Sequence, residues 1–267
     1  MKRENKKVLR NILIGALAGI MLIVAGVAVG ANSGFSFRGG WNEITKEANA
    51  AYNAASKIDT IAIEAESGRV TLRAADAEKT SVDYFCDDRV LVTFVESEGT
   101  LTVSQTIRPA FLNTYGGEIV ITMPADNTYN VNVSLNAGNV DCSGLNADTV
   151  QVGLNGGNIT MENCTAENAS IQADAGEIDL RTCTVTKLRT AVDAGNIKGT
   201  GITVDNAAFA VDAGEINVEC LGVQSEYTLT GKISIGICNF EDQAGTTQKY
   251  IHAQADVGNI RIVFAAA

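Results

Sequence analysis

The stretch VDAGNIKGTGITVDNAAFAVDAGEINVEC, residues 192–220, contains nearly the same six residues twice, 19 positions apart. Val192–Ile197 (VDAGNI) returns as Val211–Ile216 (VDAGEI). The glycine of this frame recurs at the same spacing, at Gly138, Gly157, Gly176, Gly195 and Gly214. A looser frame, in which glycine precedes alternating apolar residues, begins at Gly68, Gly99, Gly117, Gly231 and Gly258. Self-similarity at a fixed period is the sequence signature of a repeat protein.

Each repeat has the pattern of a strand and a turn. Alternating apolar and polar residues after the glycine predict a strand with one buried face. The glycine, with Asn or Asp two residues before it, is typical of a turn that needs a positive φ. Because 19 residues are too few for two strands and a crossover helix, a βαβ unit is excluded. We therefore expect an all-β, single-stranded β-solenoid (β-helix) with coils of about 19 residues.

Stacked coils should place equivalent residues in columns. The position two residues after the glycine is always β-branched and predicts a core column of Val140, Ile159, Ile178, Ile197, Ile216 and Ile233. The position seven residues after it is also apolar and predicts a second column of Leu145, Cys164, Cys183, Ile202, Leu221 and Cys238. The residues between glycine and the first column are polar and should face water: Asn139, Asn158, Glu177, Asn196 and Glu215.

The N-terminus differs from the repeats. Five basic residues precede an uncharged apolar run, which predicts one N-terminal transmembrane helix with its basic end in the cytoplasm. The alternative is a signal peptide cleaved near Val29-Gly30-Ala31. We expect a cytoplasmic basic tail (1–10), a transmembrane signal-anchor (11–31), a juxtamembrane linker with a short helix over the alanine-rich residues 42–57 (32–57), and an extracellular β-solenoid domain (58–267).

The charge is concentrated outside the N-terminal segment. Residues 1–31 contain five basic residues and one acidic residue, so the net charge of −11 leaves −15 on the rest of the chain. Such an acidic domain is not expected to bind nucleic acid or an anionic lipid surface. The partners expected are the membrane, through residues 11–31, and a cell-surface protein, peptide or glycan of unknown identity.

The six cysteines allow two interpretations. In an exported chain they can form a disulfide framework. However, Cys164, Cys183 and Cys238 occupy a column that elsewhere holds Leu or Ile, and Cys142 occupies a position that holds Met161 in the next coil. Because free cysteine behaves as a small apolar residue, we expect buried thiols in the stack.

Motifs for catalysis or metal binding are lacking. The chain has no GxSxG, HExxH, P-loop or paired Cys/His metal spacing, and its single histidine, His252, is expected to be a strand residue. Asn136, Asn155, Asp174, Asp193 and Asp212, with Asp256 later, share one position and resemble the acid column of a calcium-binding β-roll. Since Asn takes the place of Asp in two of these coils, turn formation is the favoured role and no calcium site is expected. The sequence thus predicts no catalytic, cofactor-binding or metal residue and leaves the ligand-binding residues unknown.

An enzyme that acts on polysaccharides stays an alternative. Solenoid enzymes use carboxylates and basic residues on an exposed sheet, and a small basic group exists here: Arg181, Lys187, Arg189 and Lys198. These residues do not assemble a recognisable site.

The whole arrangement resembles a known family. A basic tail, one apolar span, the strand Ile58–Glu64, the frame Ser67–Leu72, Gly99–Ser104 and Ile119–Pro124, and then the run of AG[EN]I coils are similar to the bacterial "putative adhesin" β-helical surface domains, including those of the LiaG and LiaX type. The resemblance covers residues 58–264 and implies a non-enzymatic surface interaction or envelope-stress module. A structural spacer is the further alternative. The chain departs from the family in its cysteines and in the insertion Glu241–Gln248.

Overall fold

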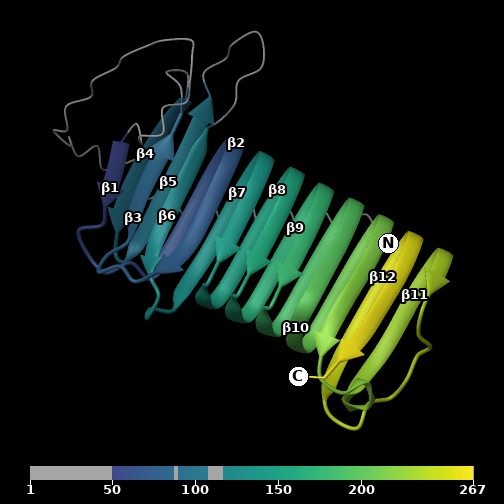
Figure 1. The fold of residues 1–267 in the computed structure, drawn as a ribbon. Helices are drawn as coiled ribbons and strands as arrows, with labels where there is room; N and C mark the ends of the chain where they lie inside the picture. The colour runs from purple at the N-terminus through teal and green to yellow at the C-terminus, as the bar shows by residue number, and fades with distance from the viewer. Residues whose placement is uncertain (1–49, 87–89, 108–116, 267) are drawn as a thin grey trace. The chain divides into compact units, whose positions relative to one another are not determined.

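The computed structural model describes residues 50–86, 90–107 and 117–266. These residues form an all-β protein with one open 12-stranded sheet, an arrangement consistent with a solenoid (Figure 1). The only helical element in these ranges is the short 3-10 helix η1, and they contain no helix long and apolar enough to span a membrane. The strands are β1 (Ala50–Asn53), β2 (Thr60–Ala75), β3 (Ser81–Phe85), β4 (Val90–Ser97), β5 (Thr100–Ile107), β6 (Glu118–Pro124), β7 (Tyr129–Ser143), β8 (Asn146–Glu162), β9 (Thr165–Arg181), β10 (Thr184–Leu221), β11 (Tyr227–Cys238) and β12 (Lys249–Ala265), with η1 at Gln224–Glu226.

The middle of the sheet is a parallel ladder in which each rung is one repeat. Strands β7, β8, β9 and β10 pair in parallel, each residue with the one 19 positions along the chain over most of the rung. β10 is long enough to supply two rungs, since its first half pairs with β9 and its second half with β12. Ile178 pairs with Ile197, which confirms the predicted register, and both side chains are fully buried.

The glycines of the repeat form a stacked corner, which we call the first corner. Their φ angles lie between 119° and 145°, a range that disfavours any residue with a side chain. A Cβ atom on Gly176 would lie 1.7 Å from the carbonyl oxygen of Gly157, and Gly195 has the same relation to Gly176. The first corner stacks Gly68, Gly138, Gly157, Gly176, Gly195, Gly214, Gly258 and Gly236.

The sheet does not follow chain order at its C-terminal end. β12, the last strand of the chain, lies between β10 and β11, and β11 is the terminal rung (Figure 1). The expected frame at Gly231 is therefore wrong, because the glycine that stacks on Gly258 is Gly236. Consequently Cys238, not Ile233, continues the first core column beside Ile260.

The N-terminal end of the sheet shows the same kind of insertion. β2 pairs on one side with β7 and on the other with β5 and β6, although β5 and β6 come between β2 and β7 in the chain. The frame at Gly117 aligns with Gly68 at the first corner. The frame at Gly99 does not, because Thr100 pairs with Thr60, well before that corner.

The helix expected over residues 42–57 is wrong for the described residues 50–57. Ala50–Asn53 form strand β1, which pairs antiparallel with β3, and Tyr52 stacks on Phe94 with ring centroids 5.5 Å apart. The carboxylate of Glu96 accepts hydrogen bonds from the amides of Ala55 (2.8 Å) and Ser56 (2.7 Å). These long-range contacts override the helix propensity of the alanines. Residues 42–49 and the expected anchor at 11–31 lie outside the described residues.

Buried thiols fill the stack, as predicted for Cys142, Cys164 and Cys183. Cys142, Cys164, Cys183 and Cys220 are buried free thiols, whereas Cys238 is only half-buried. Burial raises the pKa of Cys142 and of Cys220 to about 12, so both thiols stay protonated. The Cys164 thiol lies 3.6 Å from the carbonyl oxygen of Cys142 in the neighbouring coil. Thiols thus fill the stack where other coils use Met or Leu.

Candidate interaction surface

Each coil presents two outward faces, one on either side of the first corner. In both arms buried side chains alternate with half-buried or exposed ones, so every second residue points outward. We call the arm before the first corner the leading arm and the arm after it the trailing arm. Because the coils are in register, outward residues of one arm form continuous rows along the ladder.

Three outward rows in the middle of the leading arms form a surface without carboxylates, which we call the acid-free face. It is bordered on one side by Asp148, Glu167 and Asp205, and on the other by the row of Asn and Asp residues before the first-corner glycines. Its outward side chains are mainly amides, hydroxyls, alanine and glycine, with four basic or histidine side chains. Over β7 to β12 they are Asn130, Asn132, Ser134, Thr149, Gln151, Gly153, Asn168, Ser170, Gln172, Lys187, Arg189, Ala191, Asn206, Ala208, Ala210, Thr228, Thr230, Lys232, Tyr250, His252 and Gln254. With rungs about 4.8 Å apart, this gives regular rows of hydrogen-bonding groups. Tyr250 is the exposed aromatic side chain of the face, at 48%.

The trailing arms form a charged face. Lys198 Nζ lies 2.7 Å from Glu177 Oε2 in the preceding coil, and Arg181 Nη2 lies 2.5 Å from Asp179 Oδ2. Farther along, Arg261 donates to Asn217 Oδ1 at 3.0 Å. Oppositely charged side chains of this face therefore pair with one another. Such solvent-accessible ion pairs contribute little to stability.

The basic group suggested by the sequence is divided between the two faces. Arg181 and Lys198 lie on the charged face, where each pairs with a carboxylate. Lys187 and Arg189 lie on the acid-free face, and Lys187 Nζ is 3.8 Å from Glu167 Oε1 at its margin. The four residues do not converge on one site.

The Asn and Asp residues two positions before the first-corner glycines form one exposed or half-exposed row. Asn155 Nδ2 donates to Asn136 Oδ1 at 3.2 Å, so the neighbouring asparagines form a side-chain ladder. Asp174, Asp193 and Asp212 continue the row in the next coils. In the part of the chain that the structure describes, no three His, Cys, Asp or Glu side chains are grouped to hold a metal ion.

His252 lies in β12 within the acid-free face, which confirms it as a strand residue. Its Nδ1 is 2.7 Å from the Thr230 hydroxyl of the neighbouring rung. A surface depression of about 190 Å³ lies elsewhere, near the start of the sheet, and is lined by Ala55, Ser56, Lys57, Ile58, Glu78, Lys79, Thr80, Pro124 and Asn127. It is distant in the ladder from His252, so the two do not combine into a catalytic arrangement.

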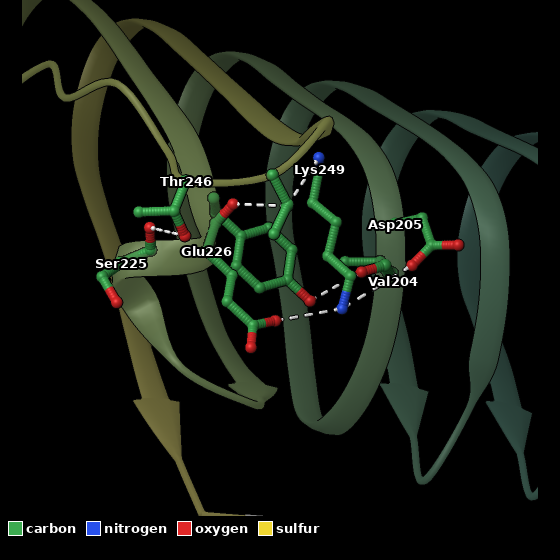
Figure 2. A network of polar contacts seen from close by, with 8 residues as sticks. Val204, Asp205, Ser225, Glu226, Thr246 and Lys249 are labelled. Carbon is green, nitrogen blue, oxygen red and sulfur yellow. Dashed lines mark hydrogen bonds and ion pairs between the residues drawn. The ribbon is translucent and has the colours of Figure 1, made fainter.

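A polar network holds the insertion Glu241–Gln248 and the start of β12, the strand that lies between β10 and β11. Figure 2 shows Lys249, at the start of β12, between Glu226 (3.2 Å) and Asp205 (4.0 Å). The Tyr227 hydroxyl donates to the Val204 carbonyl at 2.7 Å. The insertion is hydrogen-bonded to η1, because the Thr246 amide and hydroxyl both donate to the Ser225 carbonyl. The network has a structural role.

The division of charge between the faces was missed at the level of sequence. The net charge of the whole domain averages over the faces and does not reveal a surface without carboxylates. The signal was present in the repeat, because the outward positions of residues 149–153, 168–172 and 187–191 contain no Asp or Glu. Sorting charges by column rather than by domain would have revealed it.

These observations define an all-β repeat protein with two chemically distinct sheet faces. The chain belongs to the Toastrack DUF4097 family, whose model matches residues 58–266. The family model confirms the resemblance noted from the repeat frames. No curated protein matches the chain.

Several solved structures are similar in fold. A "putative adhesin" from Bacteroides fragilis has 16% identity and a TM-score of 0.46 over 82% of this chain and 99% of its own. A "putative lipid binding protein" from Parabacteroides distasonis has 16% identity and a TM-score of 0.39 over 81% and 95%. A "putative cell adhesion protein" from Clostridium sporogenes has 10% identity and a TM-score of 0.29 over 81% and 99%.

Proposed function

We propose that the protein is a non-enzymatic, adhesin-like interaction module, a β-solenoid anchored in the cell membrane by residues 11–31, with its C-terminal domain outside the cell. The basic residues before the apolar run support this orientation. The names of the similar structures support a surface role rather than catalysis. A spacer would need no chemical difference between its faces, and the acid-free face favours binding over that alternative.

The acid-free face is the observation that supports binding. Its rows of Asn, Gln, Ser and Thr offer both donors and acceptors, while Ala and Gly between them leave the surface flat. Partners rich in hydroxyl groups suit such a surface, because the hydroxyls of each sugar ring can replace their hydrogen bonds to water by hydrogen bonds to side-chain amides. The partner proposed is an uncharged glycan strand that lies along the rungs, with Tyr250 as an apolar contact.

Binding of the residue 32–267 fragment to a glycan array and to isolated cell wall tests this proposal. Gln151→Glu with Gln172→Glu places carboxylates in the middle of the acid-free face and should reduce binding by at least about 10-fold, since two hydrogen-bonding amides are lost. Glu162→Gln on the charged face is the matched control and should bind as the wild type does. Equal binding by both variants would remove the acid-free face as the binding surface.

The topology is tested separately. Protease added to intact cells should remove the C-terminal domain and leave a small membrane-bound fragment. Protection of the domain until the cells are lysed would show that the proposed orientation is wrong.

A further inference from the structure

The outer edge of the terminal rung carries exposed aliphatic side chains. Ile235 is 67% exposed and Ile237 is 71% exposed, and Val257 of the adjacent rung is 49% exposed. β11 pairs with β12 on its inner side. On its outer side, within the described residues, the first half of β11 is covered by the insertion. Leu229 makes an isolated bridge with Gln243, the Tyr227 carbonyl and Thr228 hydroxyl accept hydrogen bonds from Gln243 and Gly245, and the Gly231 amide donates to Asp242. Residues 232–238 and Val257, here named the terminal edge, are thus left open.

The repeat itself provides the control for this observation. The column directly after the first-corner glycine is polar in six rungs and apolar in the terminal rung, where it holds Ile237. The polar residues are Asn139, Asn158, Glu177, Asn196, Glu215 and Asn259. In the column before the first-corner glycine, alanine or glycine occupies five coils, and then Val257 and Ile235 appear. Terminal units of repeat proteins normally carry a polar outer face. Here the change runs in the opposite direction, which indicates a surface that is covered.

We propose that the terminal edge docks against the terminal edge of a second copy of this chain, antiparallel about a two-fold axis near Gly236. A two-fold contact needs a self-complementary edge. The sequence Ile235-Gly236-Ile237 reads the same in both directions, so the axis places Ile235 of one copy beside Ile237 of the other.

The backbone favours a strand as the occupant over a lipid surface. Hydrocarbon cannot satisfy the open N–H and C=O groups of an edge strand, whereas a second strand pairs with them. The charge favours a second copy of this edge in particular. The chain has a net charge of −11, but β11 contains only one charged residue, Lys232. The two strands that meet therefore contain no carboxylate, and their lysines lie at opposite ends of the pair.

This contact does not depend on the proposed glycan binding. The terminal edge lies at the end of the stack and shares only Lys232 with the acid-free face, so the rest of that face stays uncovered in each copy of the dimer. Loss of one property leaves the other measurable.

Sedimentation of the full chain in one fixed mild detergent tests the proposal. The wild type should have twice the protein mass of the 28.0 kDa chain. Ile235→Lys with Ile237→Lys should raise the dissociation constant at least about 100-fold, because two central apolar anchors become mutually repelling charges. Leu91→Lys with Val223→Lys replaces two other exposed aliphatic residues, which are 51% and 58% exposed and lie elsewhere, and this variant should remain dimeric. Circular dichroism melting checks that all three proteins are folded.

A photo-crosslinking residue at Ser234 identifies what lies against the edge. The expected product joins two copies, with both ends within residues 227–240. Three results would each overturn the proposal: a monomeric wild type, a dimer that persists when Ile235 and Ile237 are both replaced by lysine, or a crosslink from position 234 to any other segment.

Discussion

The two corners of each coil solve the same geometric problem in different ways. The first corner is glycine in every stacked rung, and an added Cβ atom would lie 1.6–1.8 Å from the backbone oxygen of the preceding rung. The second corner holds Gly144, Asn163, Thr182 and Gly201 in successive coils, with φ between 50° and 66°. A Cβ atom on Gly201 would meet nothing within 4 Å. A side chain is therefore excluded at the first corner by contact between rungs, whereas at the second corner it is disfavoured only by the left-handed backbone conformation of the residue itself.

The largest expected effect comes from one substitution made at each corner. Gly176→Ala forces a methyl group onto the Gly157 carbonyl and should destabilise the fold by at least about 4 kcal/mol, or prevent folding. Gly201→Ala carries only the cost of a left-handed backbone, about 1 kcal/mol. Urea unfolding of both variants measures the difference. Equal losses would mean that the corners do not differ as described.

The next effect concerns the core directly behind the first corner. Ile178→Asp buries a carboxylate between Ile159 and Ile197 and should cost about 3–5 kcal/mol. Glu177→Lys, one residue nearer the corner, replaces the partly exposed pair with Lys198 by two like charges that water screens, and should cost less than about 1 kcal/mol. Similar melting shifts for the two variants would contradict the register.

A stabilising change is expected at the second corner. Thr182 is a β-branched residue at φ 50°, where two other coils use glycine. Thr182→Gly should raise the free energy of unfolding by about 0.5–1 kcal/mol, because relief of strain exceeds the added flexibility of the unfolded chain. The control is Thr184→Gly in strand β10, which should lower stability. A loss at position 182 as large as that at 184 would show that the corner is unstrained.

The smallest effect is expected from calcium at the Asp row beside the first corner. Asp193 shares its position with Asn136 and Asn155, which retain an oxygen but lack the charge that calcium favours. The melting temperature of the 32–267 fragment should change little between calcium and chelator. A rise of many degrees with calcium, lost in Asp193→Asn, would establish a calcium site.

The sequence predicted the middle of the ladder well because the first corner tolerates only glycine. That constraint marks every rung, so the period and the core columns of residues 138–216 follow from it. The glycine constraint does not reveal the order of the rungs in the ladder. Gly231 and Gly236 are both followed by apolar residues, and only strand pairing shows that Gly236 is the one at the first corner. The insertion of β12 depends on contacts of Lys249 and Thr246, which no period records.

The start of the sheet and the candidate surface were less predictable. The alanines of residues 50–57 favour a helix locally, whereas pairing with β3 and the Glu96 hydrogen bonds are long-range contacts. To predict the acid-free face from the sequence, each charged residue must first be assigned to an arm of the coil. That assignment becomes possible only once the corner and the outward positions are known.

Disulfide formation at the first corner tests the stack and its order most directly. Positions 213 and 257 are paired in adjacent rungs, about 4.8 Å apart, a separation that a disulfide can bridge. Positions 213 and 235 would be neighbours if the rungs followed chain order, but β12 lies between them. Under mild oxidation, Ala213→Cys with Val257→Cys should form the intramolecular disulfide, and Ala213→Cys with Ile235→Cys should not. Efficient disulfide formation by the second pair and none by the first would contradict the ladder described here.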